Sequence, residues 1–153
     1  MNYRHSDRVE FFGSLGILQT DVDSITTFDL DRGEFVVRAG IDQAKSPAWQ
    51  FNVGTNLAFS SNLSARLELE GRDDSQFGYY HSAQIDGYTL MNASLRYARG
   101  QTEYQLWSRN LTDQDYSVHG LYFANDPRKG WVNETYYQYG EPRAFGISVK
   151  HSF

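Results

Sequence analysis

The sequence predicts an all-β chain that forms an antiparallel, up-and-down sheet of the kind found in transmembrane β-barrels. Three observations support this fold class. Apolar residues alternate with small or polar residues in several short segments, which is the period-two pattern of strands with one apolar face. Tight turns and long polar connections follow one another along the chain. The last segment keeps its alternation up to Phe153, where soluble domains usually have a frayed polar tail.

The composition agrees with a chain that buries its apolar surface in short segments. Aromatic residues make up 16% of the 153 residues, yet hydrophobic residues as a whole reach only 40%. The mean hydropathy is -0.60. No stretch approaches the roughly 18 to 20 apolar residues that a membrane-spanning helix needs, which excludes helical insertion. This criterion does not exclude a transmembrane β-barrel, because the apolar pattern of each barrel strand is short and weak.

The first two expected strands cover residues 9–21 and 49–59. In the first, Phe11, Leu15 and Ile17 share one face. The second reads WQFNVGTNLAF and has the clearest alternation, with Trp49 and Phe51 on its apolar face. Each segment therefore has one apolar side and one small or polar side.

The other four expected strands cover residues 63–71, 90–97 and 101–111 and the last fifteen residues, YGEPRAFGISVKHSF (139–153), whose alternation runs from 144 to 153. In the third, Leu67 and Leu69 alternate with charged residues, and in the fourth, Met91 and Leu95 alternate with polar ones. The fifth is less regular because Trp107 falls on its polar side. In the sixth, large apolar residues at odd positions alternate with small or polar residues at even positions.

We expect the apolar sides of these strands to form one continuous convex face. A register slip of one residue would turn every apolar side chain of a strand to the other side of the sheet, so the register should be well specified. The residues expected on this face are Trp49, Phe51, Val53, Leu67, Leu69, Met91, Leu95, Ile147 and Val149.

The connections between the expected strands fall into two kinds. Residues 60–62 and 98–100 form tight turns, whereas residues 22–46, 72–87 and 111–142 are long and polar. Outer-membrane barrels have short turns at one rim and long loops at the other. We therefore expect the long connections at one end of the sheet and Phe153 at the opposite end. Within the first long connection, ITTFDLDRGEFVV reads as a hairpin that turns at Asp31, Arg32 and Gly33.

Charge and motif spacing argue against several classes of function. The formal net charge of -5 and the absence of a basic stripe argue against a nucleic-acid partner. The chain has no cysteine, which excludes disulfides, thiolate metal sites and cysteine nucleophiles. The four histidines lack the spacing of metal ligands, and Asp113 with Asp115 lacks the rest of a calcium loop. We therefore expect no cofactor, no metal site and no catalytic residues.

Aromatic residues are concentrated in the long connections. The candidates for a ligand-facing platform are Tyr79, Tyr80, Trp131, Tyr136 and Tyr137. The alternative interpretation is an aromatic girdle combined with packing inside the loops. The sequence leaves both interpretations open.

Five segments give the chain a resemblance to a known family. They are DQAKSPAWQFNVG (42–54), GYTLMNASLRY (87–97), SRNLTDQDY (108–116), FANDPR (123–128) and GEPRAFGISVKHSF (140–153). In this order they resemble the C-terminal end of a TonB-dependent outer-membrane receptor. The combination of NLTD-x-x-Y, then PR-x-F-G, then a terminal Phe is its most specific part.

The resemblance implies a 22-stranded barrel that encloses a plug domain. On this interpretation residues 1–153 are the C-terminal portion of the barrel, about six strands, without the plug domain and without a signal peptide. The whole receptor would lie in the outer membrane of a Gram-negative bacterium and take up a ferric siderophore or another large nutrient. Its partners would be outer-membrane lipid, an extracellular ligand that the sequence does not identify, and the TonB complex, reached only through the missing N-terminal part.

The resemblance also assigns a role to the C-terminal strand. Outer-membrane proteins end in a strand whose final aromatic residue, with alternate apolar residues before it, is read by the outer-membrane assembly machinery. Phe153, Val149, Ile147 and Phe145 fit this pattern. His151 departs from it, because an aromatic residue such as Tyr is usual at that position.

Two other classes of function compete with the receptor fragment. The chain could be a complete small outer-membrane barrel of eight strands with a structural or adhesive role, which requires two further strands, for example within residues 22–46. It could also be an outer-membrane enzyme, which requires a nucleophile and a base on neighbouring strands. The sequence places no such pair, so we expect a protein without enzymatic activity.

Overall fold

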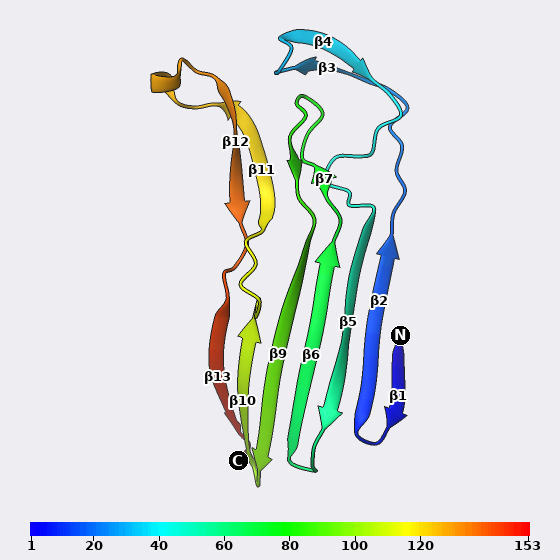
Figure 1. Ribbon diagram of the computed structural model, residues 1–153, viewed down its shortest axis with the longest axis vertical. Coiled ribbons are helices and arrows are strands. Elements are labelled where there is room, and N and C mark those ends of the chain that lie inside the picture. Colours follow the sequence, from blue (N-terminus) through cyan, green and yellow to red (C-terminus); the bar gives the residue numbers. More distant parts are fainter.

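The computed structural model describes residues 1–153, and one antiparallel sheet forms its body (Figure 1). The seven strands of this sheet follow the order β1-β2-β5-β6-β9-β10-β13. Their bounds are β1 (Asn2–Ser6), β2 (Val9–Ile17), β5 (Trp49–Ala58), β6 (Leu63–Arg72), β9 (Tyr88–Arg99), β10 (Thr102–Arg109) and β13 (Ala144–His151). Each strand pairs with its neighbour in an antiparallel sense, so the sheet is an up-and-down meander.

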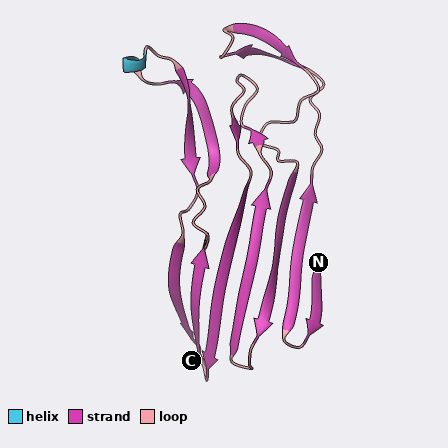
Figure 2. Cartoon of the chain, viewed as in Figure 1, coloured by secondary structure: helices cyan, strands magenta, loops and turns pink.

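Three two-stranded hairpins interrupt this meander. They are β3 (Ile25–Asp29) with β4 (Glu34–Arg38), β7 (Ser75–Gln76) with β8 (Gln84–Ile85), and β11 (Ser117–Ala124) with β12 (Asn133–Tyr139). The helical content is a short 3-10 turn, η1 (Pro127–Lys129), between β11 and β12 (Figure 2). No helix in the structure has the length and the apolar content needed to cross a membrane.

The expected fold class is confirmed, and one strand had not been expected. All six predicted strands are present, in sequence order, in a single sheet. The additional strand is β1, which extends the sheet at the free side of β2 through the pairs Asn2 with Phe12 and Tyr3 with Phe11. Its sequence, NYRHS, contains a single large apolar residue, so backbone pairing with β2 forms this strand without a period-two apolar pattern.

The register places all the apolar sides on one face, as predicted. Partners across the sheet share a face, and one row runs Phe11, Thr55, Leu67, Ala93 and Ser108 to Phe145. A second row joins Ala65, Leu95 and Leu106 to Ile147. The nine residues expected on the apolar face all lie on the same face as these two rows. Glu68, Asn92 and Arg66 lie on the other face, together with their partners.

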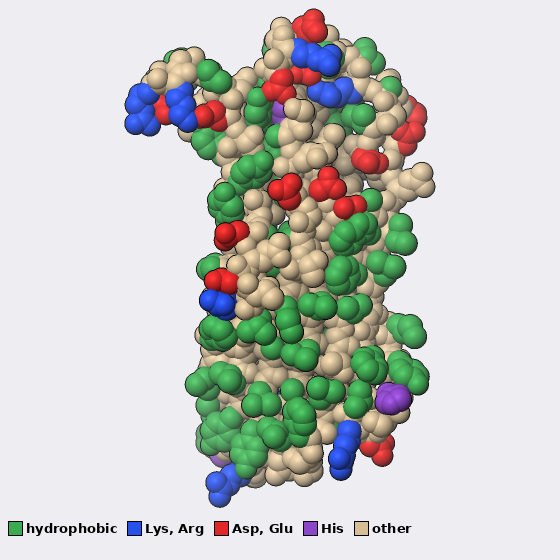
Figure 3. Space-filling model, in the orientation of Figure 1, with side chains coloured by type: hydrophobic (Ala, Val, Ile, Leu, Met, Phe, Trp, Pro, Cys, Tyr) green, Lys and Arg blue, Asp and Glu red, His purple; other side chains and the backbone are tan.

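This apolar face has no second protein layer over it. The strands of the sheet contact only their neighbours within the sheet. Leu106 is 52% exposed, Val149 61% and Ile147 76%, values far above those of core residues. In Figure 3, hydrophobic side chains cover the strand region, and charged side chains gather mainly at its two ends. A face of this size needs an apolar environment that the chain does not supply.

The two ends of the sheet differ as predicted. We call the end that carries the three hairpins the loop end and the opposite end the turn end (Figure 1). At the turn end, Ala98 N donates to Asn62 O at 2.8 Å, which ties the two tight turns together. The amide of Ser152 donates to Gln101 O at 3.0 Å, so the C-terminus also lies there. Residues 72–87 and 111–142 belong to the loop end, opposite Phe153.

The long connections contain more regular structure than the sequence analysis predicted. The hairpin expected at 25–37 is confirmed as β3–β4, with its turn at residues 30–33. The β7–β8 and β11–β12 hairpins were not predicted, because their strands are very short or combine aromatic, small and polar residues without alternation. In the sheet, β2 ends at Ile17 and β10 at Arg109, earlier than expected.

Little of the chain is buried, and most of what is buried lies at the loop end. Eleven of the 153 residues are buried, and the buried apolar ones are Phe77, Ile85 and Leu90. Phe77 and Ile85 belong to the β7–β8 hairpin, and Leu90 lies at the start of β9. The core of this structure therefore sits where the hairpins meet, and the strands below form a single layer.

Candidate functional site

Three hairpins from distant parts of the chain meet at the loop end. Leu30 N in the β3–β4 turn donates to Tyr80 O in the β7–β8 loop at 2.8 Å. Asn133 Nδ2 at the start of β12 donates to Leu30 O at 3.3 Å, and Tyr137 Oη donates to Gln84 O at 3.3 Å. These contacts join the hairpins into one assembly above the strands.

His81 lies at the centre of this assembly. Its side chain is fully buried, with 1% of the residue exposed. Its ring centroid lies 4.4 Å from that of Phe77, 4.7 Å from Tyr80 and 4.9 Å from Tyr122. The Nδ1 atom accepts a hydrogen bond from Ala83 N at 3.0 Å, and Nε2 is buried without a hydrogen-bond partner. We call these four aromatic side chains the His81 cluster.

Asp31 connects the β3–β4 turn to the His81 cluster. Its carboxylate accepts hydrogen bonds from the hydroxyl of Tyr122, and from Ser82 N at 3.3 Å and Ser82 Oγ at 3.0 Å. The hydrogen bond from Tyr122 holds the pKa of Asp31 below its ordinary value, against the effect of burial, and Ser82 adds to the decrease. Asp31 is therefore an anion at neutral pH, bound by donors from two other hairpins.

The β3–β4 turn is itself held by a buried carboxylate. Asp29 Oδ1 accepts from Asp31 N at 2.9 Å and from Arg32 N at 3.0 Å, as in the turns that Asp residues favour. Its Oδ2 accepts from Arg38 across the hairpin at 2.6 Å. The position of Asp31 is thus fixed from within its own hairpin.

Gly120 allows the β11–β12 hairpin to approach the β7–β8 loop closely. The ring of Phe77 lies against this glycine, and a Cβ atom at position 120 would come within 2.6 Å of a ring carbon. Phe77 also contacts Tyr137, the strand partner of Gly120, with ring centroids 6.4 Å apart. The absence of a side chain at residue 120 is what lets the two hairpins pack.

The aromatic residues proposed as a ligand-facing platform lie at different places. Tyr80 belongs to the His81 cluster, and the hydroxyl of Tyr79 accepts from Ala44 N at 2.8 Å. Tyr136 and Tyr137 point to opposite faces of the β11–β12 hairpin because they are sequence neighbours in a strand. Trp131 is 61% exposed beside η1. The sequence analysis missed His81 and Asp31, because their partners are far away in the sequence.

A second cluster joins the base of the β11–β12 hairpin to the top of the sheet, and Asn110 is its centre. Asn110 is 2% exposed and has a positive φ of 47°. Its Nδ2 donates to Gln114 O at 2.9 Å and to Glu141 O at 3.1 Å, and its Oδ1 accepts from Gln114 N at 2.9 Å. Its backbone amide donates to Asn92 Oδ1 at 3.1 Å. One side chain thus fixes both strands where they leave the sheet.

The rest of the NLTD-x-x-Y and GEPR segments form the same cluster. Asp113 Oδ2 pairs with Arg143 at 3.1 Å, and Asp113 Oδ1 accepts from Arg143 N. The ring of Tyr116 lies against Gly140, where a Cβ would come within 2.0 Å of it, and its hydroxyl accepts from Glu141 N at 3.2 Å. The two most specific segments of the sequence therefore meet across β10 and β13 and have a structural role.

The polar face of the sheet carries a network of paired charges. Arg66 donates to Glu68 at 2.9 Å and stacks over the ring of Phe12 at 3.8 Å, and Asn52 also donates to Glu68. Nearer the turn end, Arg96 pairs with Glu103 at 2.5 Å. The charges of this face are thus mostly satisfied within it.

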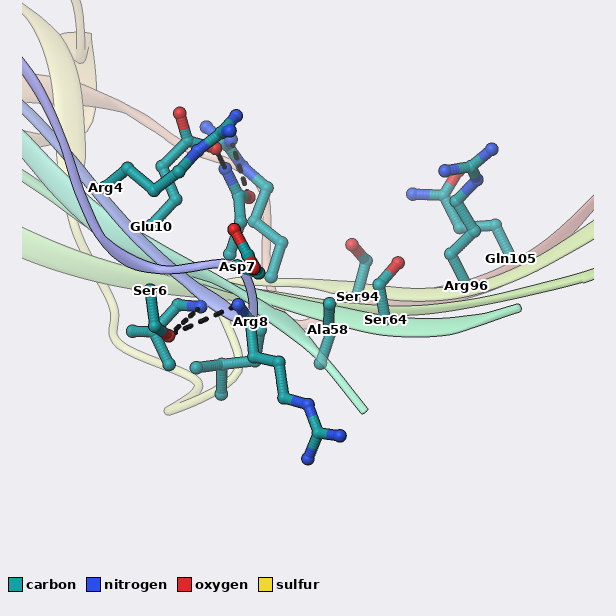
Figure 4. A pocket seen from close by; sticks show the side chains of 15 residues that line it. Arg4, Ser6, Asp7, Arg8, Glu10, Ala58, Ser64, Ser94, Arg96 and Gln105 are labelled. Carbon is teal, nitrogen blue, oxygen red and sulfur yellow. Dashed lines mark hydrogen bonds between the residues drawn. The ribbon is translucent and has the colours of Figure 1, made fainter. Parts of the chain in front are cut away.

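A hollow opens on the polar face at the turn end (Figure 4). Its lining includes Arg4 from β1, Asp7 and Arg8 from the turn between β1 and β2, Glu10 from β2, and Arg96 from β9. In Figure 4, Arg4 lies beside Glu10, and Arg8 points away from the sheet. Four arginines and two acidic residues line this hollow, so basic groups predominate in its lining.

The structure contains one hydroxyl close to a histidine outside the loop end. Thr102 Oγ1 lies 2.9 Å from His151 Nδ1, on the exposed β10–β13 pair. No carboxylate is hydrogen-bonded to this histidine, so the third member of a catalytic triad is missing. No group of three or more His, Cys, Asp or Glu side chains has the geometry of a metal site.

Three residues of the expected assembly signal lie on β13, and the fourth, Phe153, follows it. Phe145, Ile147 and Val149 project from the apolar face at the edge of the sheet and are all exposed. Phe153 lies past the end of the strand, fully exposed, with its ring 4.9 Å from that of His151. This arrangement is the alternation predicted from the sequence.

Comparison with known proteins gives matches in structure only. No protein-family model matches the chain, and no curated protein matches its sequence. The siderophore receptor PiuA from Acinetobacter baumannii matches 97% of this chain with a TM-score of 0.73 and 14% identity. The ferric yersiniabactin uptake receptor FyuA from Yersinia pestis matches 99% with a TM-score of 0.71 and 15% identity. The ferric citrate transporter FecA matches 94% with a TM-score of 0.57 and 16% identity.

These matches confirm the family resemblance at the level of the fold. The chain spans about a fifth of the length of each receptor: 20% of PiuA, 22% of FyuA and 21% of FecA. The aligned part includes nearly every residue of this chain, hairpins as well as sheet. The chain therefore has the fold of one segment of a TonB-dependent receptor barrel.

We expect Asn110→Ala to loosen the base of the β11–β12 hairpin. The change removes three hydrogen bonds from the Asn110 side chain to the backbone of Gln114 and Glu141, each worth about 0.5 to 1.5 kcal/mol, and puts Ala at a positive φ. Hydrogen–deuterium exchange of the full-length protein should become faster at residues 111–116 and 140–143. Asp115→Ala, at an exposed position of the same loop, is the control. Equal exchange in the two variants would contradict the role of Asn110.

Proposed function

We propose that this chain is the C-terminal part of the β-barrel of a TonB-dependent outer-membrane receptor. The full-length protein would capture a ferric siderophore or another large nutrient outside the cell and import it with energy from the TonB complex. The siderophore and ferric citrate receptors that share its fold support this class of substrate.

The observation that carries the proposal is the uncovered apolar face of the single-layer sheet. A soluble sandwich would cover such a face with a second sheet, and this chain has none. Lipid is the environment that satisfies an apolar face of this extent beside an opposite face of paired charges. On this proposal the loop end lies outside the cell, the turn end faces the periplasm, and the polar face lines the lumen.

The alternative of a complete eight-stranded barrel is not favoured. It requires two further strands in the sheet from residues 22–46, and residues 25–38 instead form the separate β3–β4 hairpin at the loop end. The strand added to the six expected ones is β1, which gives seven strands in an open sheet. A structural or adhesive small barrel therefore lacks the strands that it needs.

An outer-membrane enzyme is also less well supported. The proteins that share the fold are transport receptors. The Thr102 and His151 pair is exposed and has no carboxylate to orient the imidazole. We therefore propose a receptor without enzymatic activity, which acts by binding and transport.

Growth on defined nutrients tests the uptake function. A strain that lacks the gene for the full-length protein should grow poorly when iron, or another scarce nutrient, is supplied as one particular large complex. Supply of the same nutrient in a freely diffusible form should restore growth, as should the intact gene. Growth equal to that of the parent strain on every ferric siderophore, ferric citrate and large carbon source tested would overturn the proposal.

Charge substitutions on the two faces of β5 test which face contacts lipid. Val53→Arg places a charge on the apolar face near the middle of the sheet. A charge on a lipid-facing site at the bilayer midplane destabilises a barrel by about 2 to 4 kcal/mol. Asn52→Arg places the same charge on the polar face beside Glu68 and Glu70. Urea titration of the folded receptor in membranes should show a lower midpoint for Val53→Arg only. Equal midpoints would mean that the apolar face does not contact lipid.

Removal of Phe153 tests the assembly signal. We expect deletion of Phe153, or Phe153→Asp, to reduce folded receptor in the outer membrane far more than Phe145→Ala does. Truncation of a buried Phe costs about 3 to 5 kcal/mol, so an explanation from stability alone predicts the opposite order. The structure reduces that opposing effect, because Phe145 is exposed on the apolar face. Heat-modifiable receptor in isolated outer membranes is the measurement, and an equal or greater loss for Phe145→Ala would argue against an assembly signal.

A further inference from the structure

His81 is a buried titratable group at the place where the hairpins of the loop end meet. The β7–β8 loop places it between Phe77 and Tyr80 of its own loop and Tyr122 of β11. With Nδ1 accepting from Ala83 N, the neutral ring carries its proton on Nε2. Nε2 is buried and has no hydrogen-bond partner. A second proton on Nδ1 would break the bond to Ala83 and place a cation in an aromatic enclosure without a paired acceptor.

The charges around His81 come from the β3–β4 hairpin. Burial lowers the pKa of His81 below its ordinary value of about 6.5, the negative charges of Asp31 and Asp29 oppose this decrease, and Arg38 adds to it. Both carboxylates already have donors: Asp31 is bound by Tyr122 and Ser82, and Asp29 by Arg38. Neither of them is hydrogen-bonded to the imidazole.

We propose that His81 is a pH-sensitive latch, which holds the β3–β4, β7–β8 and β11–β12 hairpins together when neutral and releases them when protonated. Release would break the hydrogen bonds between the hairpins. These are the one from Leu30 N to Tyr80 O and those from Tyr122 and Ser82 to Asp31. The latch concerns the loop end alone. It therefore goes beyond the proposed uptake function and holds whichever nutrient the protein binds.

The direction of the pH effect follows from the form of histidine that the closed cluster holds. The closed form binds fewer protons than the open form, because the pKa of His81 is lower in the closed form. Its stability is fully present above about pH 6.5 and is lost as the pH falls toward the lowered pKa of His81. With one proton involved, the opening constant rises by at most about tenfold per pH unit in this window. Asp31 remains ionised there because its own pKa is lowered.

A distance measurement across the hairpins tests the latch. The chain has no cysteine, so Arg32→Cys in the β3–β4 turn and Asn125→Cys beyond β11 provide two exposed labelling sites. Spin labels at these positions are introduced into the full-length protein in outer-membrane vesicles, in a cysteine-free background. Pulsed electron paramagnetic resonance at pH 7.5 should give one narrow distance distribution. At pH 5.0, we expect a broader and longer distribution to replace much of it.

Substitutions of two histidines identify the titrating group. His81→Phe keeps an aromatic ring in the cluster and cannot be protonated, and His81→Asn offers an amide oxygen in place of Nδ1 to accept from Ala83. With either variant, the distribution should be the same at both pH values. His119→Gln removes the other loop-end histidine, which lies on the opposite face of β11 from Tyr122, and should leave the pH response unchanged.

Three results would overturn the proposal. They are an unchanged distance distribution in the unsubstituted protein between pH 7.5 and 5.0, a pH response that persists without His81, and loss of the response in His119→Gln. The amount of folded, heat-modifiable receptor is measured for every variant, so that a failure to assemble is distinguished from an open latch. Growth assays are not used, so failure of the uptake proposal leaves this test intact.

Discussion

One constraint governs the rest of this structure: the strand register keeps all apolar side chains of the sheet on the same face. The row of cross-strand partners that runs from Phe11 of β2 to Phe145 of β13 stays on one face of the sheet throughout. Because successive residues of a strand point to opposite sides, a single slip would have brought Glu68 and Arg66 to the apolar face. The uncovered apolar face, the paired charges opposite it and the separation of the two ends all depend on this register.

The sequence was sufficient to predict those parts of the fold that depend on local periodicity. Strands such as β5 and β6 alternate strictly, and the β3–β4 turn contains Asp31, Arg32 and Gly33 in a recognisable pattern. The strand β1 has no such pattern, and it forms because β2 offers it an edge. Likewise, β11 reads SVHGLYFA, where the small Gly120 is required by Phe77 of another hairpin and not by the strand itself.

The candidate site was harder to predict, because its contacts join residues that are far apart in the chain. Tyr122 and Asp31 are separated by 91 positions, and Ser82 and Asp31 by 51. His81 drew attention in the sequence only as one of four histidines without metal-ligand spacing. Aromatic loop residues were identifiable as a class, but whether Tyr136 or Tyr137 faces the cluster depends on the register of the β11–β12 hairpin. Burial and partners decide which polar residue matters, and neither is a local property.

The division of the chain into a loop end and a turn end also affects how sequence change is tolerated. The Asn110 cluster separates the β11–β12 hairpin from the paired region of β10 and β13, so altered residues beyond it, such as those near η1, touch no strand of the sheet. At the turn end, Asn62 O and Gln101 O accept hydrogen bonds from the backbone amides of Ala98 and Ser152, so a longer turn there would disturb these contacts. Sequence changes around η1 can therefore accumulate without altering the pairing of the sheet strands. An inserted epitope would have its natural place in the segment around Asn125 to Gly130.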